Sequence, residues 1–253
     1  MFGAEERRFG GIARLYGADG AHRLAQAHVA IVGIGGVGSW SAEALARSGV
    51  GSLTLIDLDI VAESNVNRQI HAQDSNFGKA KVAAMAERIR EYSPTCQVHT
   101  VDDFLSPDNA KTLLDQSFDA LIDATDQVKA KCAMIGYCSR HRPLYMVTVG
   151  AAGGQVDPTR VRADDLARTI QDPLLARVRA ELRKQHGFPR QPGKRFGIVA
   201  IYSDEPLRYP PASCSAPSGS AGLNCSGFGS SVCVTATFGL AAAAQVINHL
   251  TRP

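Results

Sequence analysis

The sequence predicts an α/β protein with a Rossmann-like, doubly wound, mostly parallel sheet and a flexible C-terminal extension. Three observations lead to this fold class. Short apolar runs alternate with helical patterns over the first two thirds of the chain. The first run ends in a glycine-rich turn at 33–38 (G-I-G-G-V-G) that opens a helix. Two later runs end in aspartate, at Asp57 and Asp123, as strands do at the ligand-binding edge of such a sheet.

The individual elements follow from local patterns of apolar residues. Runs rich in β-branched and aliphatic residues predict strands at 28–33, 52–57, 98–101, 120–123 and 144–149. Apolar residues at helical spacing predict helices at 37–47, 79–92, 109–114 and 128–141. Serine and glycine end the first of these helices, and Pro94 follows the second.

The character of the chain changes after Gly150. Residues 164–185 are charged and helical in pattern, with Pro173 inside the predicted helix. Residues 187–229 are rich in Gly, Pro and Ser, which indicates long functional loops or a mobile lid. The apolar stretch 232–247 predicts a final buried or interface helix. It is shorter than the roughly 18–20 residues of a membrane span, so we expect no span.

Composition and charge indicate an ordinary globular protein. The chain has 253 residues, 45% hydrophobic and 20% charged, with a net charge of +3 (27 − 24). That charge does not by itself indicate nucleic-acid binding. The N-terminus is charged rather than apolar, and the six cysteines are dispersed. We therefore expect a cytoplasmic location and, because no C-x-x-C pair is present, no zinc.

The glycine turn has the spacing of a phosphate-binding turn. Gly33, Gly35 and Gly38 fit G-x-G-x-x-G directly after a strand, where glycines admit a phosphate close to a helix N-terminus. Asp57 ends the second strand, where a carboxylate can bind ribose hydroxyls. A tight turn without ligand and a nicotinamide enzyme both remain open at this point.

The following segment favours a triphosphate. Asn65 and Arg68 come shortly after Asp57, and Lys79 and Lys81 open the next helix. Arginine and lysine bind phosphate oxygens, whereas either lysine alone could equally lie on a solvated helix face. Asp126 follows the fourth strand, where it could bind Mg²⁺ beside a polyphosphate or simply cap a helix.

Together, the segments G-I-G-G-V-G, D-L-D, S-N-V-N-R-Q, K-A-K and D-A-T-D resemble the adenylating domain of the E1-like (ThiF-MoeB-HesA) superfamily. The resemblance implies that ATP and a carboxylate react to an acyl-adenylate. It implies Gly36 beneath the phosphates, Asp57 at the ribose and Asn65 positioning the polyphosphate. Arg68 and Lys81 would bind the polyphosphate and act in catalysis, with Asp126 holding Mg²⁺. The predicted binding residues are thus Gly33, Gly35, Gly36, Gly38, Asp57, Asn65, Arg68, Lys81 and Asp126.

Further segments resemble the tRNA threonylcarbamoyladenosine dehydratase family, among them 67–72 (N-R-Q-I-H-A), 153–159 (G-G-Q-V-D-P-T) and 225–229 (C-S-G-F-G). The resemblance implies that the threonine carboxylate of the modified tRNA is adenylated and closed to a hydantoin with loss of water. It also implies a homodimer, with a cysteine desulfurase and a sulfur acceptor as possible partners. Residues 1–253 then form a single E1-like domain, with the ATP-binding core at about 22–150 and substrate-facing loops plus the C-terminal helix at about 151–253.

Some assignments stay open. Cys225 could be a nucleophile, although intramolecular attack by the carbamoyl nitrogen requires no thiol, and a packing role is favoured. Relatives carry an N-terminal arginine that completes the neighbouring subunit's ATP site, and Arg8 and Arg14 are both candidates. The basic residues between 168 and 195 could bind tRNA or be a solvated surface, namely Arg168, Arg177, Arg179, Arg183, Lys184, Arg190, Lys194 and Arg195.

Three rival functions have distinct signatures. An enzyme that adenylates a ubiquitin-like sulfur carrier would act on a protein C-terminus, and paired zinc cysteines are common in such enzymes. An NAD-dependent oxidoreductase would bind NADH and not ATP. A non-catalytic scaffold for sulfur transfer would not need Asp126.

Overall fold

The computed structural model describes residues 4–140, 144–209 and 228–252. Within them, seven strands form one sheet in the order β3-β2-β1-β4-β5-β7-β6. Neighbouring strands are parallel, except that β6 is antiparallel to β7. The strands are β1 (His28–Val32), β2 (Ser52–Ile56), β3 (Gln97–Val101), β4 (Ala120–Asp123), β5 (Tyr145–Val149), β6 (Val161–Asp165) and β7 (Val199–Ser203). The predicted mostly parallel α/β sheet is thereby confirmed.

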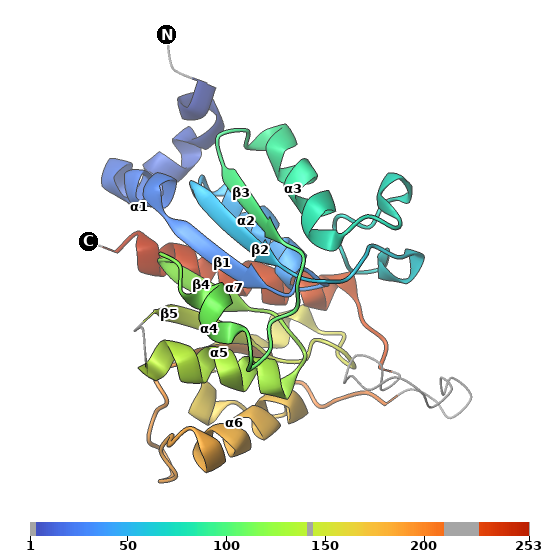
Figure 1. Cartoon of the computed structure of the whole chain (residues 1–253), viewed down its shortest axis with the longest axis vertical. Coiled ribbons are helices and arrows are strands. Elements are labelled where there is room, and N and C mark those ends of the chain that lie inside the picture. Colours follow the sequence, from blue (N-terminus) through green and yellow to red (C-terminus); the bar gives the residue numbers. More distant parts are fainter. Residues whose placement is uncertain (1–3, 141–143, 210–227, 253) are drawn as a thin grey trace.

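Helices cover both faces of this sheet (Figure 1). One face carries α1 (Ala4–Gln26), α2 (Gly38–Arg47), α3 (Lys81–Tyr92) and α7 (Val232–Leu250), and the other carries α4 (Ala110–Leu114), α5 (Val128–Arg140) and α6 (Pro173–Gln185). Side chains alternate between the two cores, as strand geometry requires. In β1, Val29 and Ile31 join the first core, and Ala30 and Val32 join the second.

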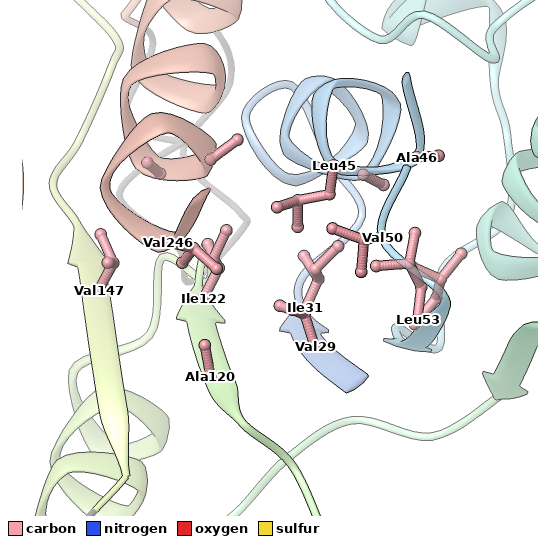
Figure 2. Packing of buried hydrophobic residues seen from close by; sticks show 14 of the residues in the cluster. Val29, Ile31, Leu45, Ala46, Val50, Leu53, Ala120, Ile122, Val147 and Val246 are labelled. Atoms are coloured by element: carbon pink, nitrogen blue, oxygen red, sulfur yellow. The ribbon is translucent and has the colours of Figure 1, made fainter. Parts of the chain in front are cut away.

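Figure 2 shows the first core, where Ile31 of β1 and Ile122 of β4 lie between Leu45 of α2 and Val246 of α7. Each of these four side chains is fully buried. Such burial is worth about 1.5–3 kcal/mol for one aliphatic side chain. Helices α2 and α7 therefore fix one face of the strands that carry the site.

The chain order creates a crevice beside the first strand. From β1 the chain moves outward through β2 to β3, and it then returns through α4 to β4 on the opposite side of β1. The connections after β1 and β4 therefore leave towards different faces of the sheet. Open α/β sheets bind ligands at the carboxyl ends of two such strands, so the expected site lies between the turns after Val32 and Asp123.

Helix α7 is packed into the protein, although it is 19 residues long and apolar enough to cross a membrane by length and composition. One stripe of it is buried, including Phe238, Ala242 and Val246. Gly239 allows a close crossing with α2, because a Cβ there would lie 2.4 Å from the Val37 carbonyl oxygen. Ser41 Oγ donates to the Gly239 carbonyl oxygen at 3.0 Å. These contacts are those of a core helix.

Three parts of the fold differ from the sequence expectation. Helix α1, with a break at Gly17 (φ 77°), was not predicted. The predicted helix over 164–185 is wrong in its first half, which forms the end of β6 and a 3-10 turn η4 (Leu166–Arg168). Pro173 is the first residue of α6 rather than an interior one, a position that tolerates proline because no N–H is needed there. Strand β7 lies within 187–229, so this part of the expected extension completes the sheet.

Candidate functional site

A cavity of about 590 Å³ lies at the carboxyl ends of β1 and β4. Its lining includes Gly33, Gly35, Gly36, Asp57, Asn65, Arg68, Lys81 and Asp126. Of the predicted binding residues, Gly38 does not line it. Gly33 and Asp126, which are 93 residues apart in sequence, therefore meet at one place.

Glycine is required at positions 33, 35 and 38 of the turn for different physical reasons. Gly33 has φ +88°, and a Cβ there would lie 2.9 Å from the Ala124 carbonyl carbon. A Cβ at Gly38 would lie 1.8 Å from the Gly33 carbonyl oxygen, so this glycine closes the turn against α2 rather than facing a ligand. At Gly35 a Cβ would meet just Gln69 Nε2, 4.0 Å away, and it would otherwise project into open space. Gly35 therefore lets backbone approach whatever occupies the cavity.

Asp57 is held in place by backbone donors. Its Oδ2 accepts from the Ile34 N–H at 2.6 Å, and its Oδ1 accepts from the Asp59 N–H at 2.8 Å. Burial raises the pKa of Asp57, and the nearby Lys81 ammonium acts in the opposite direction. Because each carboxylate oxygen has a second lone pair, Asp57 can still accept hydrogen bonds from ribose hydroxyls.

Lys81 brings a buried cation to the cavity. The residue is 6% exposed, and its Nζ donates to Asp59 Oδ2 at 2.6 Å. Asp59 itself is largely exposed and belongs to the same D-L-D segment as Asp57. An ammonium has three donors, so a phosphate oxygen can be bound beside the Asp59 carboxylate.

Arg68 lies against the glycine turn. A Cβ at Gly36 would be 3.1 Å from Arg68 Cγ, so the arginine stem covers that glycine. Trp40 Nε1 donates to the Arg68 carbonyl oxygen at 3.0 Å, and Arg68 Nη1 donates to the Ser64 carbonyl oxygen at 2.8 Å. The Asn65 carboxamide oxygen accepts from the Ala62 N–H at 3.1 Å, which shapes the turn η1 (Glu63–Asn65). The guanidinium is thereby placed at the cavity wall.

Asp123 is the last residue of β4 and Asp126 follows the strand, and the two aspartates have separate surroundings. Asp126 lines the cavity. Asp123 is fully buried, and its Oδ2 accepts from Lys131 Nζ at 3.1 Å and from Thr148 Oγ1 at 2.7 Å. Lys131 Nζ also donates to the Val149 carbonyl oxygen at 2.6 Å. This network ties the loop after β4 to the end of β5, and so fixes the loop that carries Asp126.

Sequence reasoning did not assign three of these residues a role: Asp59, Gln69 and Lys131. Gln69 lines the cavity with a 5% exposed side chain, and its Oε1 has no hydrogen-bond partner among the described residues. The R-Q pair beside Arg68 was the available signal for Gln69. For Lys131 the sequence gives no such signal. The residue has the pattern of an ordinary helix lysine, because its partner Asp123 belongs to another element.

Other predicted residues lie away from the cavity. Arg8 Nη1 donates to the Tyr92 carbonyl oxygen of the same chain at 3.3 Å, while Arg14 lies on α1. Cys225 falls outside the described residues. In the basic segment, Arg179 donates to Thr169 Oγ1, and Arg183 donates to the Pro189 carbonyl oxygen and lies over the Phe196 ring. Those two arginines are therefore part of the packing, whereas the exposed residues are Arg168, Arg177, Lys184, Arg190, Lys194 and Arg195.

In the described part of the chain, neither the buried thiols nor a group of metal-ligating side chains contributes to the site. Burial raises the pKa of Cys96 to about 11 and that of Cys132 to about 12, so neither thiol is poised to ionise. Within the described ranges, no three or more His, Cys, Asp or Glu side chains are grouped so as to hold a metal ion. A magnesium ion at Asp126 would take most of its ligands from phosphate and water, as is usual for this ion.

The fold and the site define a nucleotide-binding α/β protein whose glycine turn lines one cavity together with a lysine, an arginine and a carboxylate. The family comparison agrees with this class. Residues 10–252 match the model of the ThiF family, and the chain belongs to that family.

Individual relatives are similar over nearly the whole chain. The tRNA threonylcarbamoyladenosine dehydratase of Haemophilus influenzae is 48% identical over 250 residues, which cover 98% of this chain and 94% of that protein. The crystal structure of Escherichia coli tRNA N6-threonylcarbamoyladenosine dehydratase (TcdA) in complex with ATP has a TM-score of 0.89 at 45% identity, covering 98% of this chain and 96% of that one. The complex of the same enzyme with AMP has a TM-score of 0.90.

Proposed function

We propose that this chain is an ATP-dependent tRNA threonylcarbamoyladenosine dehydratase, which cyclises the modified adenosine to its hydantoin form. One observation carries the proposal. The chain places a glycine turn, Asp57, Arg68, Lys81 and Asp126 around one cavity, and a 45% identical enzyme of this name and nearly the same length has been solved with ATP.

The donors that line the cavity suit ATP. Gly35 opens the backbone to the cavity, and Lys81 and Arg68 supply positive charge from two sides. Bound ATP supplies a phosphorus that activates the threonine carboxylate by turning its oxygen into a leaving group. Arg68 and Lys81 then stabilise negative charge on the phosphates, Asp57 and Asn65 orient the nucleotide, and Asp126 holds Mg²⁺.

Ring closure requires chiefly proximity. The carbamoyl nitrogen and the activated carboxyl belong to one side chain of the modified base, so their effective concentration is very high. The nitrogen bonds to the carboxyl carbon, the bond to the activated oxygen breaks, and the nitrogen loses a proton. The net change is loss of one water, with ATP converted to AMP and pyrophosphate. No enzyme thiol is needed, which leaves Cys225 without a required role.

We extend the proposal to partners and location. The exposed basic residues on α6 and after it are a phosphate-binding surface for tRNA. The protein is cytoplasmic and forms a homodimer, in which Arg8 or Arg14 of one subunit completes the neighbouring site. A cysteine desulfurase and its sulfur acceptor are further partners.

One experiment tests substrate and reaction together. Purified protein, ATP and Mg²⁺ are incubated with tRNA that carries the threonylcarbamoyl group, and the nucleosides are analysed by mass spectrometry. The expected result is a nucleoside lighter by the mass of one water, together with AMP. Unchanged nucleosides together with a carrier-protein adenylate in a parallel reaction would instead support an enzyme that activates a sulfur carrier.

A further inference from the structure

A second cavity, of about 500 Å³, lies beside the nucleotide cavity. Both cavities are lined by Arg68, Gly153 and Ser230, so they meet along one wall. The remaining lining comes from Glu63, Ser64, Val66, Asn67, Phe228 and Gly229. A substrate group seated in the second cavity is therefore next to the cation that faces the nucleotide phosphates.

An aromatic pair stands at this second cavity. Phe228 lines it, and the ring of Tyr209 lies 5.2 Å from the Phe228 ring, centroid to centroid, at an interplanar angle of 51°. Tyr209 is 76% exposed and Phe228 is half-buried. A tyrosine this exposed gains little from packing within the protein, so its ring is available to a ligand.

The pair is fixed to the frame of the active site. The Gly154 N–H donates to the Gly229 carbonyl oxygen at 2.9 Å, and the Arg208 N–H donates to the Gly154 carbonyl oxygen at 2.8 Å. Gly154 has φ +73°, and a Cβ there would lie 2.9 Å from Phe228 Cδ1. The backbone next to Tyr209 and Phe228 is thus tied to Gly154, whose neighbour Gly153 lines both cavities.

Polar groups beside the rings suit a nucleotide. The Arg208 side chain is 67% exposed, with its Nε 3.5 Å from Glu205 Oε1. The other Glu205 oxygen accepts from the N–H groups of Val156 and Asp157 at 3.0 and 2.9 Å. The guanidinium of Arg208 can therefore turn towards a phosphate without leaving a buried carboxylate unpartnered.

We propose that Tyr209 and Phe228 form a stacking surface for an unpaired purine base of the RNA substrate, with Arg208 binding its backbone phosphate. Proteins that read single-stranded RNA stack bases on aromatic rings next to basic side chains. This proposal rests on the proposed function, under which the stacked base is the modified adenine. The side chain of that base then reaches past Arg68 towards the nucleotide.

Two measurements test the stacking surface in the full-length protein. The first is the steady-state KM for modified tRNA and, separately, for ATP, in Tyr209→Ala, Tyr209→Phe and Phe228→Leu. The second is fluorescence of an anticodon stem-loop with 2-aminopurine in place of the target adenine, which is quenched on stacking. Ile170→Ala is a matched control, because Ile170 is 55% exposed and lines neither cavity.

We expect Tyr209→Ala and Phe228→Leu to raise the KM for tRNA by about 5- to 150-fold, which corresponds to the loss of one stacked base. The KM for ATP should change less than about two-fold, quenching should be lost in Tyr209→Ala, and Tyr209→Phe should restore both. Unchanged tRNA KM and unchanged quenching in both loss variants would overturn the proposal. If the wild-type protein forms no cyclic nucleoside, the proposed function fails instead, and the quenching result still decides whether the two rings bind a base.

Discussion

Lys81 is the first residue of α3 and Lys79 lies two residues before it, but their side chains face different surroundings. Lys81 is 6% exposed at the cavity, with its ammonium on Asp59 at 2.6 Å. Lys79 pairs with Glu87 at 2.8 Å at the surface, where both side chains are substantially exposed. The two residues are therefore a matched pair for testing which lysine binds ATP.

We predict that Lys81→Ala lowers kcat/KM for ATP by about 10- to 100-fold, because a charge-assisted contact to phosphate is worth about 1.5–3 kcal/mol. Lys79→Ala should change it less than two-fold, since exposed ion pairs contribute little. ATP–pyrophosphate exchange with modified tRNA measures both variants. Equal losses in the two lysines would show that general surface charge, not the position of Lys81, matters.

The glycine turn yields a second contrast. Gly38→Ala should destabilise the protein by about 1–3 kcal/mol or more, because the new Cβ would lie 1.8 Å from the Gly33 carbonyl oxygen. Gly35→Ala should leave the free energy of unfolding within about 0.5 kcal/mol, since its Cβ meets open space, yet weaken ATP binding. Urea unfolding and titration of ATP separate the two effects. A Gly35→Ala protein that binds ATP normally would place the phosphates elsewhere.

The buried pair of Lys131 and Asp123 supports a stability prediction. Both side chains are fully buried, so Lys131→Met should cost about 3–5 kcal/mol by leaving a buried carboxylate without its partner. The double variant with Asp123→Leu should recover part of this loss, because no uncompensated charge remains. Thermal unfolding of the two variants and the wild type measures the difference. Additive losses in the double variant would contradict a coupled pair.

His71 makes the stability of the protein dependent on pH. Its side chain is buried, neither ring nitrogen has a hydrogen-bond partner among the described residues, and burial lowers its pKa to about 4. Because the folded pKa lies below the unfolded value, this contribution is complete above about pH 6.5 and is lost as pH falls towards about 4.

The expected loss is about 2 kcal/mol of unfolding free energy at pH 5 relative to pH 7.5. His71→Leu should be close to neutral at pH 7.5, because no hydrogen bond is removed, and it should abolish this part of the pH dependence. Urea unfolding at both pH values measures it. An unchanged slope in His71→Leu would mean that other groups cause the acid sensitivity.

The first half of the fold could be predicted because its signals are local. Strands β1, β2 and β4 are continuous apolar runs that end in a glycine or an aspartate, and the helices between them have clear periodicity. The crevice follows from the order of these elements alone. The binding residues predicted from motif spacing and family resemblance all line the cavity except Gly38.

The remainder depends on contacts that no local pattern contains. Strand β6 (V-R-A-D-D) has just two apolar residues, Val161 and Ala163, which is too weak a pattern to predict a strand, and it pairs with β7 at the sheet edge. Strand β7 is a short apolar run surrounded by loop-like sequence. Lys131 of α5 is buried against Asp123 of β4 and against Thr148 and the Val149 carbonyl of β5, which lie outside the sequence pattern of that helix.

The central place of α7 has a consequence for biosynthesis. Residues 232–250 pack on α2 and β5, and these elements are translated about 80–190 residues earlier. While the ribosome is still making the middle of the chain, the apolar surface of α2 and β5 has no partner from α7. The growing chain therefore cannot complete its first core during most of translation, and it is in this interval that we expect dependence on chaperones that shield exposed apolar surface.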